Sequence, residues 1–197
     1  HAMRNTHVPP GFWRGVNINQ NAVFMECFID ELAEYAGVDP VDFRRKYSAN
    51  YPRNLAVLNA VADRIGWTKP APAGVFRGIA QQKSFGSWVA AACELSVTDG
   101  NKIKIHRIVA ATDPGYAVNP AQIERQVSGS FVYGLSALFE EECTVKNGRI
   151  EQTNFDTFGS IRLKQMPPVE TIIIQGGGKE WGGIGEPTIS VAAPAVL

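Results

Sequence analysis

Cysteine and histidine are scarce in this sequence, with three residues of each among 197. The cysteines, Cys27, Cys93 and Cys143, are far apart and form no C-x-x-C pair, which argues against a disulfide framework, a zinc knuckle or an iron–sulfur cluster in this chain. The histidines are isolated as well, so no protein metal site is predicted. Cys27 lies in a helix-like stretch and Cys93 in a strand-like one, and we expect both to be buried as small hydrophobes.

An excess of charge is also missing, because 19 Lys and Arg residues balance 19 Asp and Glu residues. This balance gives no reason to expect a nucleic acid or an anionic membrane as partner. No apolar run reaches the roughly 18–20 residues that a membrane-spanning helix needs. A Gly-x-Ser-x-Gly motif is absent, so serine-hydrolase chemistry has no support. With 45% apolar and 19% charged residues, the composition is that of an ordinary globular protein.

Both ends of the chain look artificial. Residues 1–3 (HAM) resemble a tag remnant, and the last residues read as the start of a helix that is cut short. Since we expect the true N-terminus to be missing, a bacterial cytoplasmic and a periplasmic location both stay open. The segment 69–74 (KPAPAG) is the best internal boundary. It predicts a helical segment over 4–70 and a second part over 71–197 that is truncated at its C-terminus.

Helices are predicted in the first part. The first covers 21–36, and Asp39 and Pro40 are the N-cap and first residue of a second, short helix. A third covers 55–65 and ends at Gly66. The predicted buried stripe of the first helix consists of Ala22, Met25, Phe28, Ile29, Leu32 and Ala36.

The second part alternates strands with one long helix. The hairpin turn Asp99-Gly100-Asn101 joins two of the strands, and Asn119-Pro120 caps and opens the helix. Gly129 and Gly134 lie inside this helix, where each costs about 1 kcal/mol against Ala, so we expect close packing there. The predicted strands are 78–82, 88–97, 103–112, 138–145, 149–154 and 169–175. The pattern predicts an α+β fold, with a mostly antiparallel sheet and helices packed on it.

The strongest local signal for chemistry is Gly182-Gly183-Ile184-Gly185-Glu186-Pro187. Glycines let a backbone approach a ligand closely, and Pro187 favours a first helical turn, so Glu186 would stand at a helix start. Two interpretations compete: a carboxylate that caps the helix, or a general base that points into a cavity. The spacing alone does not decide between them.

Three weaker signals accompany this one. Arg14 and Gly15 precede a helix and could hold an anionic or polar group, or form an ordinary surface turn. Gln126, on the long helix, could bond a cofactor through its amide, or be solvated. Phe85 and Trp88 could wall a pocket for a flat apolar substrate, or be core aromatics.

Together and in this order, the motifs resemble the molybdopterin-binding large subunits of the xanthine dehydrogenase/aldehyde oxidase family, and most closely the isoquinoline 1-oxidoreductase branch. The resemblance covers residues 9 to 197. The matching segments are Trp13-Arg14-x-Val16 with Gln20-Asn21-Ala22, Phe28–Ala33, Asp39–Arg45, Arg77–Ala80, Ser84–Ser87, Asn119 to Gly129, and Gly183–Pro187.

The resemblance implies a molybdenum–molybdopterin cofactor, usually in the cytosine dinucleotide form in bacteria, with no protein side chain on the metal. It implies that Glu186 is the base that takes a proton from a hydroxide on molybdenum, with water as the oxygen source. Arg14, Gly15, Gln126 and Gly185 would then bind the cofactor. The substrate pocket would include Val16, Phe85 and Trp88.

Departures from the family pattern limit this hypothesis. Xanthine oxidases have a Phe where this chain has Val16, so we expect an N-heteroaromatic or aldehyde substrate instead of a purine. Other cofactor loops of the family are absent, so the fragment is expected to lack cofactor and activity alone. Its partners would be the missing N-terminal part of the same subunit and a small [2Fe–2S] subunit. The alternative is a cofactor-free interaction module of the same fold.

Overall fold

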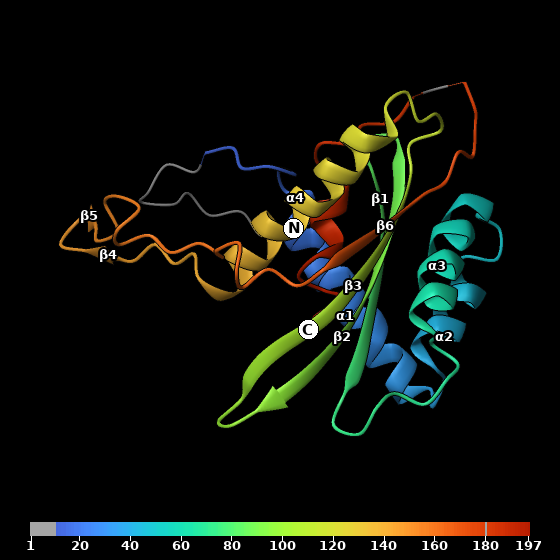
Figure 1. The fold of residues 1–197 in the computed structure, drawn as a ribbon, viewed down its shortest axis with the longest axis horizontal. Coiled ribbons are helices and arrows are strands. Elements are labelled where there is room, and N and C mark those ends of the chain that lie inside the picture. The colour runs from blue at the N-terminus through green and yellow to red at the C-terminus, as the bar shows by residue number, and fades with distance from the viewer. Residues whose placement is uncertain (1–10, 180) are drawn as a thin grey trace.

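A computed structural model of the protein describes residues 11–179 and 181–197, and the suspected tag remnant at 1–3 lies outside them. A four-stranded sheet forms the middle layer, with α2 and α3 on one face and α4 with the short helix η1 on the other (Figure 1). The elements are α1 (Ile18–Tyr35), α2 (Pro40–Tyr47), α3 (Pro52–Ile65), β1 (Phe76–Ser84), β2 (Ser87–Thr98), β3 (Lys102–Asp113), α4 (Pro120–Phe139), β4 (Val145–Lys146), β5 (Arg149–Ile150), β6 (Val169–Ile173) and η1 (Pro187–Val191).

The sheet has the strand order β1-β2-β3-β6. β1 pairs with β2, and β2 with β3, in antiparallel fashion, whereas β6 is parallel to β3. The predicted turn between β2 and β3 is present, and Gly100 and Asn101 adopt φ angles of 70° and 71° that these two residue types tolerate. The α+β fold with a mostly antiparallel sheet is therefore confirmed.

Both faces of the sheet are buried. Val89, Ala91 and Cys93 of β2 face α4 and η1, whereas the alternating Ala90 and Ala92 face α3, as the two-residue period of a strand requires. Residues of α2 and α3 share a hydrophobic core with the sheet. The segment near residue 70 therefore marks the point in the sequence where the helices end and the strands begin. Cys93 is buried as expected, whereas Cys27 is only half-buried.

The helix termini follow local chemistry. The Asp39 carboxylate accepts hydrogen bonds from the backbone N–H groups of Val41 and Asp42, at 2.8 and 3.2 Å, which confirms it as the N-cap of α2. Gly66 ends α3 in the left-handed conformation, with φ of 77°. Asn119 caps α4 through its side chain. Within the described residues, no helix is long and apolar enough to cross a membrane.

The predicted buried face of α1 is partly wrong. Ala22 and Ile29 are buried, but the other buried positions are Glu26 and Ala33, whereas Met25, Phe28 and Leu32 of the predicted stripe are exposed. The physical reason is a buried ion pair between Glu26 and Arg44 of α2, which turns the helix by about one position. An apolar face of α1 is left in contact with solvent.

The predicted strands 138–145 and 149–154 are also wrong in extent. The helical stripe of α4 continues through Leu135 to Leu138, which packs on the core, so the helix extends to Phe139. Only two residues on each side of the turn form a hairpin, β4 with β5. These residues are exposed, so no buried face stabilises a longer pair.

Candidate functional site

A strained turn before α1 presents the first functional groups. Gly15 and Val16 both have positive φ angles, 87° and 50°. The side-chain amide of Asn19 donates hydrogen bonds to the carbonyls of Arg14 and Val16, at 2.7 and 3.3 Å. A side chain on Gly15 would overlap Asn19 Oδ1 and lie 2.6 Å from Ile189 Cγ2. Asn19 and the missing side chain at Gly15 thus fix where Arg14 leaves the backbone.

The Arg14 guanidinium joins three segments that are far apart in the sequence. Its Nε donates to the Gly185 carbonyl at 2.5 Å. Its Nη2 donates to Gln126 Oε1 at 2.9 Å, to the Gln126 carbonyl at 3.0 Å and to Ser130 Oγ at 3.0 Å. The ring of Tyr133 lies 5.3 Å from the guanidinium carbon. Arg14 thus ties the turn before α1 to α4 and to the segment before η1.

All of these acceptors are electrically neutral. Within the described part of the chain, no carboxylate lies within ion-pair distance of Arg14. Partial burial lowers the pKa of Arg14, and the negative potential of Tyr133 and Glu186 opposes this shift. A guanidinium stays charged under these conditions, so the site holds a positive charge that Glu186 influences without forming an ion pair with it.

The Glu186 carboxylate lies beside this arginine. Glu186 occupies the N-cap position of η1, yet its side chain makes no capping hydrogen bond. Instead its Oε1 accepts a hydrogen bond from the backbone N–H of Gly15 at 3.3 Å. Glu186 therefore stands at the helix start as predicted but does not cap it through a hydrogen bond, and its half-buried carboxylate faces the Arg14–Gly15 turn.

The glycine-rich segment before Glu186 is held against the turn between β1 and β2. The N–H of Gly183 donates to the Phe85 carbonyl at 2.7 Å, and Ser87 Oγ donates to the Gly183 carbonyl at 2.5 Å. A side chain on Gly182 would overlap Ser87 Oγ and lie 2.6 Å from the Gly86 carbonyl oxygen. Close backbone contact is thus the reason for glycine here.

The other end of this segment is anchored by Asp113 at the end of β3. Its buried carboxylate receives two hydrogen bonds from Arg53, each 2.6 Å long. It also accepts from the N–H groups of Gly115 and Gly176, at 2.9 and 3.0 Å. Burial alone would raise the pKa of Asp113, but these four donors together lower it. The charged form of Asp113 therefore fixes where the segment starts.

The predicted pocket residues separate into two groups. Val16 is part of the Arg14 turn, and Phe85 contacts the glycine-rich segment, since a side chain on Gly183 would lie 3.2 Å from Phe85 Cβ; both are partly exposed. Trp88 lies on the opposite face of the sheet, with Arg53 stacked 3.7 Å from its ring. Ser87 faces the site, so the next residue of β2 must point away.

Three residues of this cluster were not predicted from the sequence: Asn19, Ser130 and Tyr133. A signal was available for two of them, because Gln126, Ser130 and Tyr133 are spaced four and three residues apart and share one face of α4. Asn19 gave no such signal, since its role depends on the turn that it closes.

The cluster lies at the surface. Gln126 is exposed, and Arg14 and Glu186 are half-buried. An apolar pocket of about 310 Å³ lies next to it, lined by Trp13, Asn19, Gln20, Val23, Gly134, Ala137, Leu138, Ile189, Ser190, Ala193 and Leu197. In the described residues there is no group of three or more side chains suited to bind a metal ion.

Curated relatives resemble nearly all of this chain. It is 26% identical over 189 residues to the beta subunit of the isoquinoline 1-oxidoreductase of Brevundimonas diminuta, covering 94% of this chain and 24% of that protein. It is also 26% identical over 207 residues to a subunit of the nicotinate dehydrogenase of Pseudomonas putida, covering 96% of this chain and 17% of that protein. The chain thus spans about a quarter or less of these relatives.

Solved structures confirm the fold. The aldehyde oxidoreductase of Desulfovibrio gigas superposes with a TM-score of 0.73 at 11% identity, covering 94% of this chain and 38% of that one. The family described as the molybdopterin cofactor-binding domain matches residues 34–167, which are 134 of the 197 residues. This chain belongs to the molybdopterin cofactor-binding domain family.

Proposed function

We propose that this chain is part of the catalytic, molybdenum-cofactor-binding subunit of a hydroxylase that oxidises an N-heteroaromatic or aldehyde substrate, with water as the oxygen source. The observation that carries this proposal is the meeting of Arg14, Gln126 and Glu186. Arg14 and Gln126 are 112 residues apart, and Gly15 and Glu186 are 171 residues apart, yet both pairs are joined by hydrogen bonds. Family membership supplies the cofactor class.

The donor set of the site fits a molybdopterin. This cofactor is polar and carries phosphate, so it requires cations and amide groups as partners. Within the described residues Arg14 forms no ion pair, although Glu186 lies near it. Gln126 is exposed, and its amide oxygen accepts a hydrogen bond from Arg14. That hydrogen bond directs the amide nitrogen of Gln126 away from the guanidinium. Arg14, Gly15, Gln126 and Gly185 would hold the cofactor, which we propose to be the cytosine dinucleotide form.

Glu186 would act as the general base. When bound, the cofactor supplies the redox chemistry and a metal centre that makes water more acidic. The Gly15 N–H holds Oε1 of Glu186, which leaves Oε2 to accept a proton from the attacking oxygen. A half-buried position lets the carboxylate reach a bound ligand and also excludes part of the solvent.

The substrate class follows from the side chains around this base. Val16 is small, and Phe85 adds a partly exposed aromatic ring, a combination that suits a flat heteroaromatic or an aldehyde. The names of the two relatives, isoquinoline 1-oxidoreductase and nicotinate dehydrogenase, support an N-heteroaromatic. Trp88 is not part of this proposal, because it faces the other side of the sheet.

The complete enzyme would need further parts. The two relatives are named as subunits, and we propose that the large subunit, of which this chain is a part, works with a small [2Fe–2S] subunit as electron acceptor. The Arg14 cluster lies at the surface of this chain, so a further wall is needed to enclose a cofactor. We therefore expect the 197-residue chain alone to be inactive, and a bacterial source fits the bacterial relatives.

The test uses the complete large subunit, co-expressed with its small subunit in a host that makes the molybdenum cofactor. Bound molybdenum is assayed first, followed by dye-coupled oxidation of isoquinoline and of an aromatic aldehyde. We expect Glu186→Gln to keep molybdenum and to lose about 10²-fold or more in activity. Glu124→Gln, an exposed residue of α4, is the matched control and should retain activity.

Two outcomes would contradict the proposal. If the wild-type protein carries no molybdenum, the chain is a cofactor-free interaction module of the same fold. If Glu186→Gln oxidises both substrates at the wild-type rate, Glu186 is not the base.

A further inference from the structure

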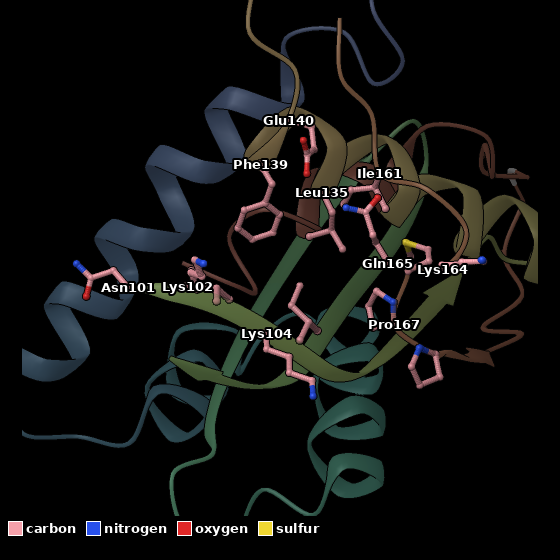
Figure 2. Close-up of a pocket in the computed structure, with 14 residues that line it drawn as sticks. Asn101, Lys102, Lys104, Leu135, Phe139, Glu140, Ile161, Lys164, Gln165 and Pro167 are labelled. Atoms are coloured by element: carbon pink, nitrogen blue, oxygen red, sulfur yellow. The ribbon is translucent and has the colours of Figure 1, made fainter. Parts of the chain in front are cut away.

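A groove of about 710 Å³ has a lining that shares no residue with the Arg14 cluster, and Figure 2 shows the side chains around it. It runs between β3, the end of α4 and the segment 161–168. Its apolar lining comes mainly from Ile105, Leu135, Phe139, Ile161 and Met166. None of these residues has a part in the proposed chemistry, so the groove needs another explanation.

One edge of β3 is open beside this groove. β6 pairs with β3 only from Ile108 to Thr112, and the Pro168 carbonyl accepts the N–H of Ile108 at 3.1 Å. Pro167 and Pro168 precede β6, and because proline has no N–H, the β6 strand cannot continue along β3. The stretch 102–107 of β3 therefore pairs with β2 on one side and, within the described chain, with no strand on the other.

The tip of the β2–β3 hairpin has even less support. The pairing of β1 with β2 begins at Phe76 and Leu95, so residues 96–104 form a two-stranded ribbon that extends away from the helices (Figure 1). The side chains of Val97 and Ile103 are 50% and 38% exposed. Two-stranded ribbons are only marginally stable in water, and an open edge is a template for another strand.

The rim of the groove is positively charged. Lys102, Lys104 and Lys164 line it and are exposed, whereas Glu140 is the one acidic residue among its lining residues. Pairing of two copies through this edge would bring lysines of both chains close together, which is unfavourable. The charge therefore favours an acidic occupant over a second copy of this chain.

We propose that the groove binds an extended segment of a partner protein, in which acidic side chains alternate with apolar ones. The segment would add a strand to the stretch 102–107 of β3, along the same edge that β6 covers from Ile108 onward. Main-chain hydrogen bonds would supply affinity, as in other strand-addition complexes. Its apolar side chains would contact Leu135 and Phe139, and its carboxylates would pair with the three lysines.

Three labelled peptides of about eight residues test this proposal on the 197-residue chain. In the first peptide, Val alternates with Glu. The second peptide has Lys in place of each Glu. The third keeps the length of the first but has Pro at every second position, the positions whose N–H groups would face β3. We expect the Val/Glu peptide to bind at least about tenfold more tightly than the Val/Lys peptide in fluorescence anisotropy at low salt. The Pro peptide, which lacks the donors, should not bind. Hydrogen exchange should slow over 102–107.

Charge reversal supplies the matched variants. Lys102→Glu combined with Lys104→Glu should weaken the Val/Glu peptide at least about tenfold. Lys146→Glu, on the exposed β4–β5 hairpin, should leave binding unchanged. Equal binding of the Val/Glu and Val/Lys peptides would overturn the proposal. So would a dimer of this chain that itself protects 102–107, or a complete large subunit in which this edge is already protected and no peptide binds.

Discussion

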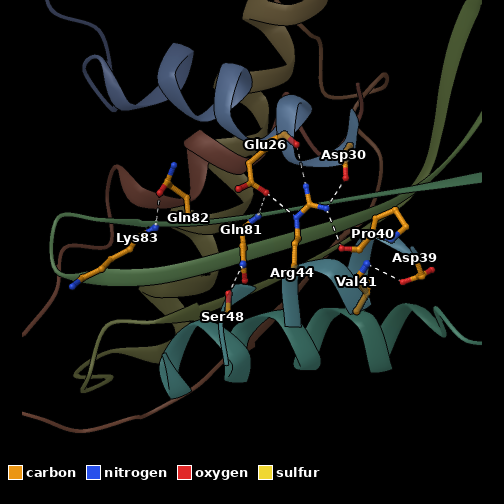
Figure 3. A network of polar contacts seen from close by, with 10 residues as sticks. All are labelled: Glu26, Asp30, Asp39, Pro40, Val41, Arg44, Ser48, Gln81, Gln82 and Lys83. Carbon is orange, nitrogen blue, oxygen red and sulfur yellow. Dashed lines mark hydrogen bonds and ion pairs between the residues drawn. The ribbon is translucent and has the colours of Figure 1, made fainter. Parts of the chain in front are cut away.

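Two arginines connect separate parts of this molecule, and their charges are balanced in different ways. Arg44 of α2 is fully buried between two carboxylates, with Nε 3.1 Å from Glu26 and Nη1 2.5 Å from Asp30 (Figure 3). Arg14 is half-buried and donates only to neutral oxygens. Ion pairs within the protein neutralise Arg44, whereas Arg14 forms no ion pair within the described residues, and we propose that its charge serves a ligand.

The buried network extends beyond its ion pairs. Glu26 also accepts the N–H of Gln81 at 2.9 Å, and the Gln81 amide donates to Ser48 Oγ at 2.9 Å. Burial raises the pKa of Glu26, and Arg44 opposes that shift. The network thereby joins α1, α2 and β1, and it holds the helix that follows the Arg14 turn. The buried charge of Arg44 thus stabilises the fold, whereas the surface charge of Arg14 is the one that we propose binds the cofactor.

The largest expected effect comes from breaking the matched pair. Arg44→Met should destabilise the chain by about 3–5 kcal/mol, because Glu26 and Asp30 lose their cation. Arg14→Met should cost only about 1 kcal/mol, since its acceptors can bind water instead. Urea unfolding of both variants measures the difference.

Arg45→Met is the control for this comparison. Arg45 is the neighbour of Arg44, but it is half-buried, pairs with the exposed Asp42 and donates to Asn59 Oδ1 at 2.8 Å, so its loss should cost only about 1 kcal/mol. Equal destabilisation by the Arg14 and Arg44 substitutions would remove the distinction between the two sites.

The second prediction concerns the anchor of the glycine-rich segment. Because the pKa of Asp113 is lowered on folding, its stabilising contribution is complete above its unfolded pKa and is lost as the pH falls through its folded pKa. Asp113→Asn should cost about 2 kcal/mol at pH 7. When urea unfolding is measured at several pH values, the difference in the free energy of unfolding between wild type and Asp113→Asn should become smaller near pH 3. A gap that is constant with pH would contradict this account.

Much of the fold could be predicted because its signals are local. The Asp39 cap, the Gly66 stop and the turn at 99–101 each depend on a few neighbouring residues, and all three are present. The buried face of α1 could not be predicted, because a hydrophobic pattern gives no reason to bury Glu26. Only its distant partner Arg44 makes that burial favourable.

In the site, too, residues with a local sequence signal could be predicted, and those whose role depends on distant partners could not. The motifs singled out Arg14, Gln126 and Glu186, and the structure brings them together. Trp88 was included because it follows Phe85 closely, but counting residues along β2 would have placed it on the other face. Asn19 was missed, since its amide acts only once the turn has formed.

The two glycines of α4 allow a smaller and matched comparison. A side chain on Gly134 would overlap Ala192 Cβ and lie 3.3 Å from the Ile189 carbonyl oxygen, whereas one on Gly129 would lie 3.4 Å from Arg14 Nη1. Gly134→Ala should therefore destabilise by about 1–2 kcal/mol through overpacking. Gly129→Ala should be neutral or stabilising by up to about 1 kcal/mol, because alanine favours the helix. Thermal unfolding of both variants would decide, and a Gly134→Ala variant as stable as Gly129→Ala would mean that α4 does not pack closely on η1.

The smallest expected effect lies in the Arg14 turn. Val16 has a φ of 50°, a conformation that is costly for a β-branched residue. Val16→Gly should stabilise the chain by about 0.5 kcal/mol, because the strain it relieves exceeds the added freedom of glycine in the unfolded state. Asn147→Gly, at a φ of 51°, is the control and should gain less, since asparagine tolerates this conformation. If Val16→Gly is the more stable variant in urea, stability does not explain the valine, and strain kept beside Arg14 and Glu186 supports a role in the site. If it is less stable, valine is there for packing alone.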